Sequence, residues 1–123
     1  MKQRKTLVAM QHALQPAQSQ ELSARGYTLA ESEAFNELKA ELSNLKFDAN
    51  LHRLASRLVD LLQEENFKAI VLPIGSPAFN HVLSYHLAHH PVRVLFAHSE
   101  RIVTINDDGT KTVQFEHQGF IRL

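Results

Sequence analysis

The sequence predicts an α/β fold built on an open, mostly parallel sheet, and three observations carry this prediction. Short apolar runs, typical of buried strands, alternate along the chain with stretches of helical periodicity. The clearest of these runs, residues 69–72, leads at once into a helix start. Near the C-terminus, Asp108-Gly109 stands between two runs of alternating polarity, which indicates a β-hairpin.

Two strands and three helices are expected in the first half of the chain. Pro16 suits the first turn of a helix, and Gly26 is well placed to end that helix. Apolar residues recur at helical spacing in the two helices that follow. In chain order, the elements are a strand at 6–10, a helix at 16–25, a strand at 27–30, a helix at 32–43 and a helix at 51–64.

The strand at 69–72 and the turn after it form the most informative stretch. Pro73 and Gly75 stop the strand, while Ser76 suits an N-cap and Pro77 the first helical position. A strand that runs through such a turn into a helix leaves backbone N–H groups facing one spot, which suits a phosphate. Many turns of this kind bind nothing, so a purely structural role is the competing interpretation.

The remaining elements continue the alternation and then end it. Pro91 prevents the helix after Ser76 from continuing. The other expected elements are a helix ending near residue 89, a strand at 92–97, an exit loop at 98–101 and hairpin strands at 102–105 and 111–115, with 119–123 extending or bending the last strand.

This alternation predicts a Rossmann-like sheet of order about 2-1-3-4, with helices on both faces and a C-terminal hairpin. The connections then reverse between the first and third strands, where open α/β sheets hold ligands beyond the carboxyl ends of the strands. Three exit loops are expected to meet there, at residues 11–12, 75–76 and 98–101. Their hydroxyl, imidazole, amide and guanidinium groups suit phosphate and ribose.

Seven residues of these loops and of the tail are candidates for the site. His12 suits phosphate contact or proton transfer near neutral pH, although an exposed loop histidine is an equally good interpretation. Arg101 suits charge neutralisation of a phosphate, or else a surface ion pair with Glu100, Asp107 or Asp108. The other candidates for phosphate or ligand contact are Ser76, Gln11, Gly75, Ser99 and His117.

Composition narrows the classes of function. The 123 residues suit a single domain, residues 1–123, and 44% hydrophobic residues can form a core. A formal net charge of zero argues against a grip on long nucleic acid, which needs a basic surface. The lack of cysteine excludes disulfides and thiolate chemistry. No signal peptide or membrane span is visible, so we expect a cytoplasmic protein without a membrane partner.

Eight histidines raise the question of a metal site. His86 and His90 are four residues apart, which can place both on one helical face. However, His90 directly precedes Pro91, and no carboxylate completes a familiar zinc spacing. Walker, Gly-x-Gly-x-x-Gly, Gly-x-Ser-x-Gly and His-Glu-x-x-His motifs are also absent from the sequence. We therefore expect neither a metal nor a cofactor.

Three stretches carry a resemblance to a known family. They are His-Ala-Leu-Gln-Pro-Ala-Gln at 12–18, Ile-Val-Leu-Pro-Ile-Gly-Ser at 70–76, and the tail at 94–120. The tail is the most specific, because it combines a strand, Ser-x-Arg at 99–101, an Asp-Gly hairpin and Phe-x-His-x-x-Phe at 115–120. Together these stretches resemble the stand-alone ring nucleases of type III CRISPR systems, small proteins of Rossmann-like, CARF-related fold that act on cyclic oligoadenylates.

The resemblance implies a homodimer that binds a cyclic oligoadenylate, above all cyclic tetra-adenylate, across its two-fold axis. It implies metal-independent cleavage, in which a ribose 2′-OH attacks the adjacent phosphorus and displaces the 5′-oxygen, and this would switch off the second-messenger signal. Arg101 would steady the phosphate charge, Ser76 with Gly75 would hold the phosphate, and His12 would transfer or orient a proton.

Two other functions stay open beside this one. The protein can bind the cyclic nucleotide without cutting it, as a sensor or sponge, because the same loops serve either role. It can also be a non-catalytic interaction domain whose α/β fold carries no small-molecule site.

Overall fold

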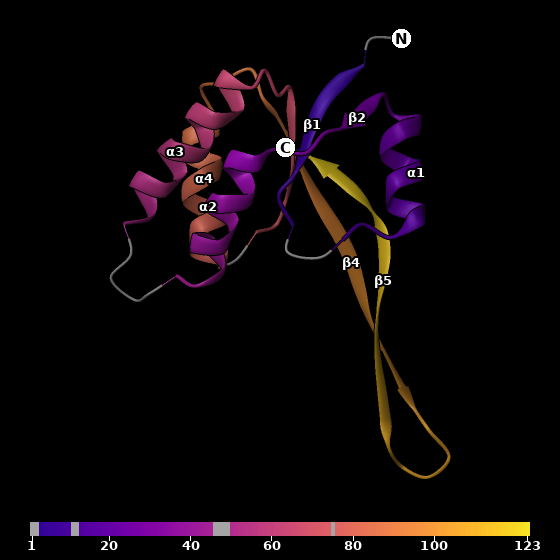
Figure 1. Ribbon diagram of the computed structural model, residues 1–123. Helices are drawn as coiled ribbons and strands as arrows, with labels where there is room; N and C mark the ends of the chain where they lie inside the picture. Colours follow the sequence, from indigo (N-terminus) through magenta and orange to yellow (C-terminus); the bar gives the residue numbers. More distant parts are fainter. Residues whose placement is uncertain (1–2, 11–12, 46–49, 75) are drawn as a thin grey trace.

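A five-stranded sheet with helices on both of its faces organises the chain (Figure 1). This computed structural model describes residues 3–10, 13–45, 50–74 and 76–123. The elements are β1 (Arg4–Val8), α1 (Pro16–Ala24), β2 (Tyr27–Leu29), α2 (Glu33–Ser43), α3 (Leu51–Glu64), β3 (Ala69–Leu72), α4 (Pro77–Leu87), β4 (Arg93–Ile105) and β5 (Lys111–Arg122).

The predicted α/β class and sheet order are confirmed. The order is β2-β1-β3-β4-β5, in which the first four strands are parallel and β5 runs antiparallel to β4. The bounds of β3 agree with the prediction, whereas β1 begins two residues earlier than expected. It does so because Arg4 is already in register with Tyr27 of the neighbouring strand.

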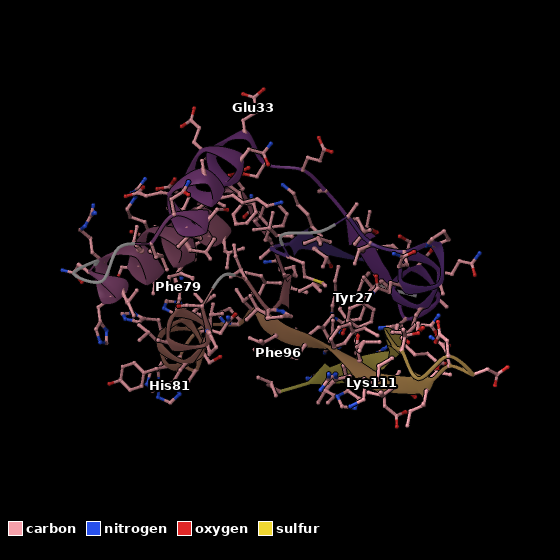
Figure 2. All side chains as sticks on the ribbon, turned by 90° about the horizontal axis from the view of Figure 1, so that it is seen from below. Tyr27, Glu33, Phe79, His81, Phe96 and Lys111 are labelled. Atoms are coloured by element: carbon pink, nitrogen blue, oxygen red, sulfur yellow. The ribbon has the colours of Figure 1, made fainter. Side chains whose placement is uncertain are left out.

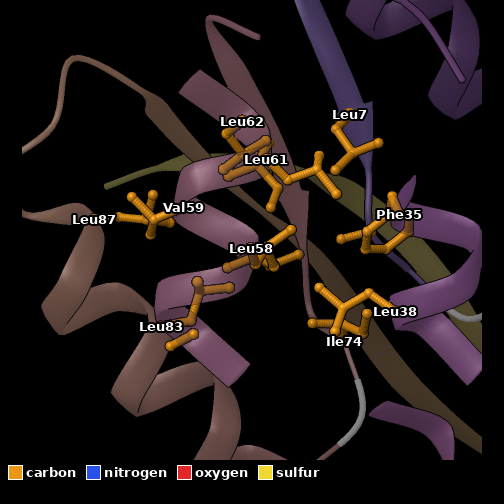
Figure 3. Close-up of a cluster of buried hydrophobic side chains, with 14 of the residues drawn as sticks. Leu7, Phe35, Leu38, Leu58, Val59, Leu61, Leu62, Ile74, Leu83 and Leu87 are labelled. Carbon is orange, nitrogen blue, oxygen red and sulfur yellow. The ribbon is translucent and has the colours of Figure 1, made fainter. Parts of the chain in front are cut away.

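Side chains of the sheet alternate between two apolar cores. On one face, Ile70 and Leu72 of β3 pack with residues of α2, α3 and α4. Figure 3 shows part of this core, with Phe35 of α2, Leu58 of α3 and Leu83 of α4 among the labelled side chains. On the other face, Ala69 and Val71 pack with residues of α1 and β5. Figure 2, which looks at the molecule from below, shows the two helical layers on opposite sides of the sheet. The fully buried run of β3 is thus explained by helices on both faces.

Helix α3 is the centre of the larger core. Leu54, Leu58 and Leu62 recur every four residues and are at most 2% exposed. Burying a leucine side chain stabilises a fold by about 1.5–3 kcal/mol relative to leaving it exposed. Asn50 caps the helix, because its side-chain oxygen accepts a hydrogen bond of 3.0 Å from the Arg53 backbone N–H. None of the helices in the described ranges is long and apolar enough to cross a membrane.

Strand β4 differs most from the prediction. The prediction of an exit loop at 98–101 is wrong, because Arg93–Ile105 is one strand of 13 residues. Strand β5, of 12 residues, pairs with it along its length, with one irregularity between His98 and Ser99. Pairing with β3 ends at Phe96, so the two long strands continue as a ribbon beyond the sheet (Figure 1). We call residues 98–118 the arm.

Asp108 organises the turn at the tip of the arm. Its carboxylate accepts hydrogen bonds from the hydroxyl (2.6 Å) and the backbone N–H (3.0 Å) of Thr110. The Thr110 hydroxyl is the larger of the causes that lower the pKa of Asp108. A lowered pKa in the folded state means that this stabilisation is present above the unfolded pKa and is lost as pH falls through the folded pKa. Gly109, at φ 86°, supplies the left-handed residue of the turn.

Candidate functional site

The carboxyl ends of β1 and β3 lie side by side where the chain connections reverse. The Ala9 N–H donates a 2.9 Å hydrogen bond to the Val71 carbonyl, which keeps the two strands together up to their ends. From here the chain leads to α1 on one face and to α4 on the other (Figure 1). Open α/β sheets bind ligands at this kind of position. The candidates Gln11, His12 and Gly75 lie outside the described residues.

Ser76 has the capping position predicted for it. Its hydroxyl oxygen accepts a 3.1 Å hydrogen bond from the Phe79 backbone N–H at the start of α4. Pro77 follows in the first turn of the helix, as the sequence suggested. The structural role of Ser76 is therefore established, and it places a hydroxyl at the amino end of a helix beside the carboxyl edge of β3.

Asn80 stabilises the turn between β3 and α4 from the buried side, and this role was not predicted from the sequence. Its side-chain oxygen accepts a hydrogen bond from the Ile74 N–H (2.9 Å), and its amide donates to the carbonyls of Ile74 and Ser76 (2.8 Å each). Asn80 is 7% exposed and Ile74 is fully buried. The signal was present, because Asn80 is a polar residue in helical register with the buried Leu83 and Leu87.

A cleft of about 560 Å³ opens beside β1, where the short strand β2 has ended. Leu7 and Phe35 give it an apolar floor, and Asn36, Ser19 and Lys39 contribute polar groups. The lining also includes Ser32 and the carboxylate of Glu31, so the cleft combines apolar and polar surface with groups of both charges.

Lys39 is the residue of the cleft that is best suited to bind an anionic ligand. It is half-buried, and its ammonium group makes no hydrogen bond or ion pair with the residues that the structure describes. Met10 and Ala13, which flank the predicted pair 11–12, line the same cleft. Lys39 was not predicted as a site residue, because a lysine on an amphipathic helix is usually solvated. Its position next to Leu38, on the border of the buried stripe, was the available signal.

His117 is bound to α1 and does not point freely into solution. Gln18 accepts the Gln15 N–H with its side-chain oxygen (2.8 Å), so its amide nitrogen is the donor to His117 Nδ1 (3.2 Å). Nδ1 is thus the acceptor nitrogen of the ring, and Nε2 carries the hydrogen. Nε2 is buried and lies 3.6 Å from a carboxylate oxygen of Glu21. Ser99 is directly opposite His117 in the β4–β5 pairing.

Arg101 lies on the arm, opposite Phe115, and not in an exit loop. The expected meeting of three exit loops is therefore corrected, because the segment 98–101 continues as a strand. The antiparallel partner β5 keeps residues 98–101 extended, and no glycine or proline interrupts them. Arg101 is exposed and, among the described residues, has no ion pair with Glu100, Asp107 or Asp108.

His86 of α4 and His90, just after α4, each contact a polar side chain of α3, which the sequence did not suggest. His86 lies 3.0 Å from His52, nitrogen to nitrogen, and His90 lies 2.7 Å from the Gln63 amide. His86 and His90 therefore have separate partners. Over the described ranges, no group of three or more His, Cys, Asp or Glu residues could hold a metal ion.

Comparison with known proteins places the chain in a family. The family described as "Uncharacterized protein MJ1673 family" matches residues 4–121. The chain belongs to the MJ1673 family. No curated protein matches it. The matched span runs from the first residue of β1 into the end of β5, so it includes the carboxyl edge, the cleft and the arm.

Proposed function

We propose that the protein is a ring nuclease, which binds a cyclic oligoadenylate, with cyclic tetra-adenylate the preferred ring, and opens it. Its role would be to switch off second-messenger signalling in type III CRISPR defence. The observation that carries the proposal is the cleft between β1, β2 and α2, which is lined by Lys39, whose ammonium group has no partner among the described residues. An apolar floor suits a base, and a lysine suits a phosphate.

The proposed reaction needs positioning more than strong acids or bases. The ribose 2′-oxygen attacks the adjacent phosphorus while the bond from phosphorus to the 5′-oxygen breaks. The 2′-OH proton is removed, the leaving 5′-oxygen takes up a proton, and a 2′,3′-cyclic phosphate results. Holding the 2′-oxygen in line with the breaking bond supplies much of the rate enhancement, and cationic or N–H groups stabilise the phosphate charge.

The residues of the sheet edge divide these tasks. Lys39 takes the charge-neutralising role that the sequence suggested for Arg101, because Lys39 lines the cleft and Arg101 lies on the arm. Ser76, at the amino end of α4, offers a hydroxyl on the neighbouring turn. His12 keeps its predicted role in proton transfer or orientation, since Met10 and Ala13 on either side of residues 11–12 line the cleft.

A homodimer completes the proposal. A symmetric ring with four phosphates presents the same chemistry to two copies of one site, so a two-fold pair of chains matches it. Each chain then needs only a few aimed groups, which agrees with a formal net charge of zero. The proposed mechanism needs neither a long nucleic acid nor a membrane as a partner.

The test is incubation of the protein with cyclic tri-, tetra- and hexa-adenylate in EDTA, with products separated by chromatography and binding measured in parallel. Conversion of cyclic tetra-adenylate to linear fragments ending in a 2′,3′-cyclic phosphate is the expected result. Tight binding of an intact ring would replace the nuclease by a sensor or sponge. Neither binding nor cleavage of any of the rings would overturn the proposal.

A further inference from the structure

The arm extends far beyond the part of the sheet that supports it. After Phe96, where pairing with β3 ends, β4 continues to Ile105 with β5 as its partner, and the ribbon projects from the body (Figure 1). An isolated two-stranded hairpin is marginally stable in water, because it buries little apolar surface. A ribbon of this length is therefore expected to gain from a partner surface.

One face of the arm is apolar. Residues directly opposite in an antiparallel pair share a face, and the pairs Arg101–Phe115, Val103–Val113 and Ile105–Lys111 alternate with the pairs of the other face. The exposed fractions are 47% for Val103, 71% for Ile105, 43% for Val113 and 73% for Phe115. We call these four side chains the arm stripe.

The opposite face of the arm is mostly polar. Its pairs are Glu100–Glu116, Ile102–Gln114 and Thr104–Thr112. A hairpin that was solvated on both faces would have no need for such a one-sided pattern. The difference between the faces therefore indicates that the arm stripe has a partner and that the polar face meets water.

The arm stripe continues a face that is already buried near the sheet. Ala97 and Phe120 form a pair on that face, and both pack in the core that α1 covers. The next pair outward, Ser99 and His117, meets α1 through the contact between His117 and Gln18. Beyond this pair the same face runs on as the arm stripe, past the first turn of α1, and is exposed.

We propose that the arm stripe packs against the arm stripe of a second copy of this chain, with the two arms antiparallel about a two-fold axis. In this arrangement the root of each arm lies beside the tip of the other. Arg101 stands at the root end of the stripe, and the tip carries Asp107 and Asp108 in its turn together with Lys111 on the stripe face. Each Arg101 therefore meets a tip in which two carboxylates outnumber one ammonium group, and this occurs twice across the interface.

Neither charge is committed within the chain. Arg101 and Asp107 are exposed, and neither has a side-chain hydrogen bond or ion pair with another described residue. Asp108 differs, because Thr110 occupies its carboxylate. The stripe can therefore pack on its own copy, with the uncommitted Arg101 of one chain beside the uncommitted Asp107 of the other, which favours a second copy over an unrelated protein.

The interface is small, so we expect a reversible dimer with a dissociation constant in the range of about 1–100 μM. The inference rests on the proposed function only where that function expects two copies, and it can be tested without the cyclic nucleotide. A dimer that opens no ring would overturn the nuclease and leave the interface. Ring opening by a monomer would overturn the interface and leave the nuclease.

The experiment is sedimentation velocity of the ligand-free full chain across this concentration range, with circular dichroism to verify folding. Phe115→Glu should raise the dimer dissociation constant by about 30-fold or more, because it replaces the largest apolar side chain of the stripe by a charged one. Arg101→Asp and Asp107→Arg should each raise it several-fold, and the double variant should restore it, because the charges are exchanged across the interface.

Glu100→Lys is the matched control, because Glu100 lies on the polar face of the same strand and should leave the dimer unchanged. A protein that stays monomeric at all concentrations would overturn the inference. A dimer that is insensitive to Phe115→Glu, or whose paired charge exchange fails to restore association, would overturn it as well. Since all these positions are exposed, the substitutions should leave the folded body intact.

Discussion

Replacing Asn80 by leucine is expected to lower the free energy of unfolding by about 2–4 kcal/mol. Leucine has a similar size but cannot bond to the backbone, so the N–H and carbonyl of Ile74 would remain buried without partners. Urea unfolding followed by circular dichroism measures the change. Because Asn80 also bonds to the Ser76 carbonyl, the turn between β3 and α4 should become less ordered.

His81→Leu is the control for this substitution. His81 is the next residue of α4 but is exposed and has no hydrogen-bond partner among the described residues, so its replacement should change stability by less than about 0.5 kcal/mol. Equal stabilities of the Asn80→Leu and His81→Leu proteins would show that the hydrogen bonds of Asn80 do not hold the turn.

Replacing Lys39 by methionine is expected to raise the dissociation constant for cyclic tetra-adenylate by about 10- to 100-fold. Methionine keeps an unbranched apolar stem but removes the ammonium group, and a hydrogen bond to a charged group contributes roughly 1.5–3 kcal/mol. Isothermal titration calorimetry in EDTA measures the affinity directly. The thermal stability should not fall, because Lys39 has no side-chain partner to lose within the described chain.

Lys68→Met provides a matched loss of one positive charge. Lys68 is exposed just before β3, at the opposite edge of the sheet from the cleft, so its replacement should leave binding unchanged. If both variants lost affinity equally, the net charge rather than the cleft would control binding. Normal affinity of the Lys39→Met protein would remove Lys39 from the site.

The sequence was sufficient for features that local patterns determine. The apolar run of β3, the stop at Pro73 and the capping Ser76 lie within one short stretch, residues 69–76. The leucines of α3 define one face of a helix. The sheet order followed from the alternation of strands and helices, because crossover connections in parallel sheets have few arrangements.

Features that depend on contacts between residues far apart in the sequence could not be predicted from local patterns. The strand character of residues 98–101 depends on pairing with residues 115–119, and the orientation of His117 depends on Gln18, which is 99 positions away. The cleft depends on the early end of β2, which leaves Lys39 of α2 beside β1. Asn80 was the exception, since a polar residue in a buried helical register was visible in the sequence.

The most direct test of the central claim is to map where the ring binds. ¹⁵N-labelled protein is titrated with a cyclic tetra-adenylate whose riboses carry 2′-fluorine, because this analogue lacks the attacking hydroxyl and cannot be opened. We predict saturable amide shifts centred on Met10, Ala13, Asn36 and Lys39, the residues that line the cleft. Shifts confined to the opposite edge, around Lys68 and Arg93, or no saturable shifts, would contradict a nucleotide site beside β1.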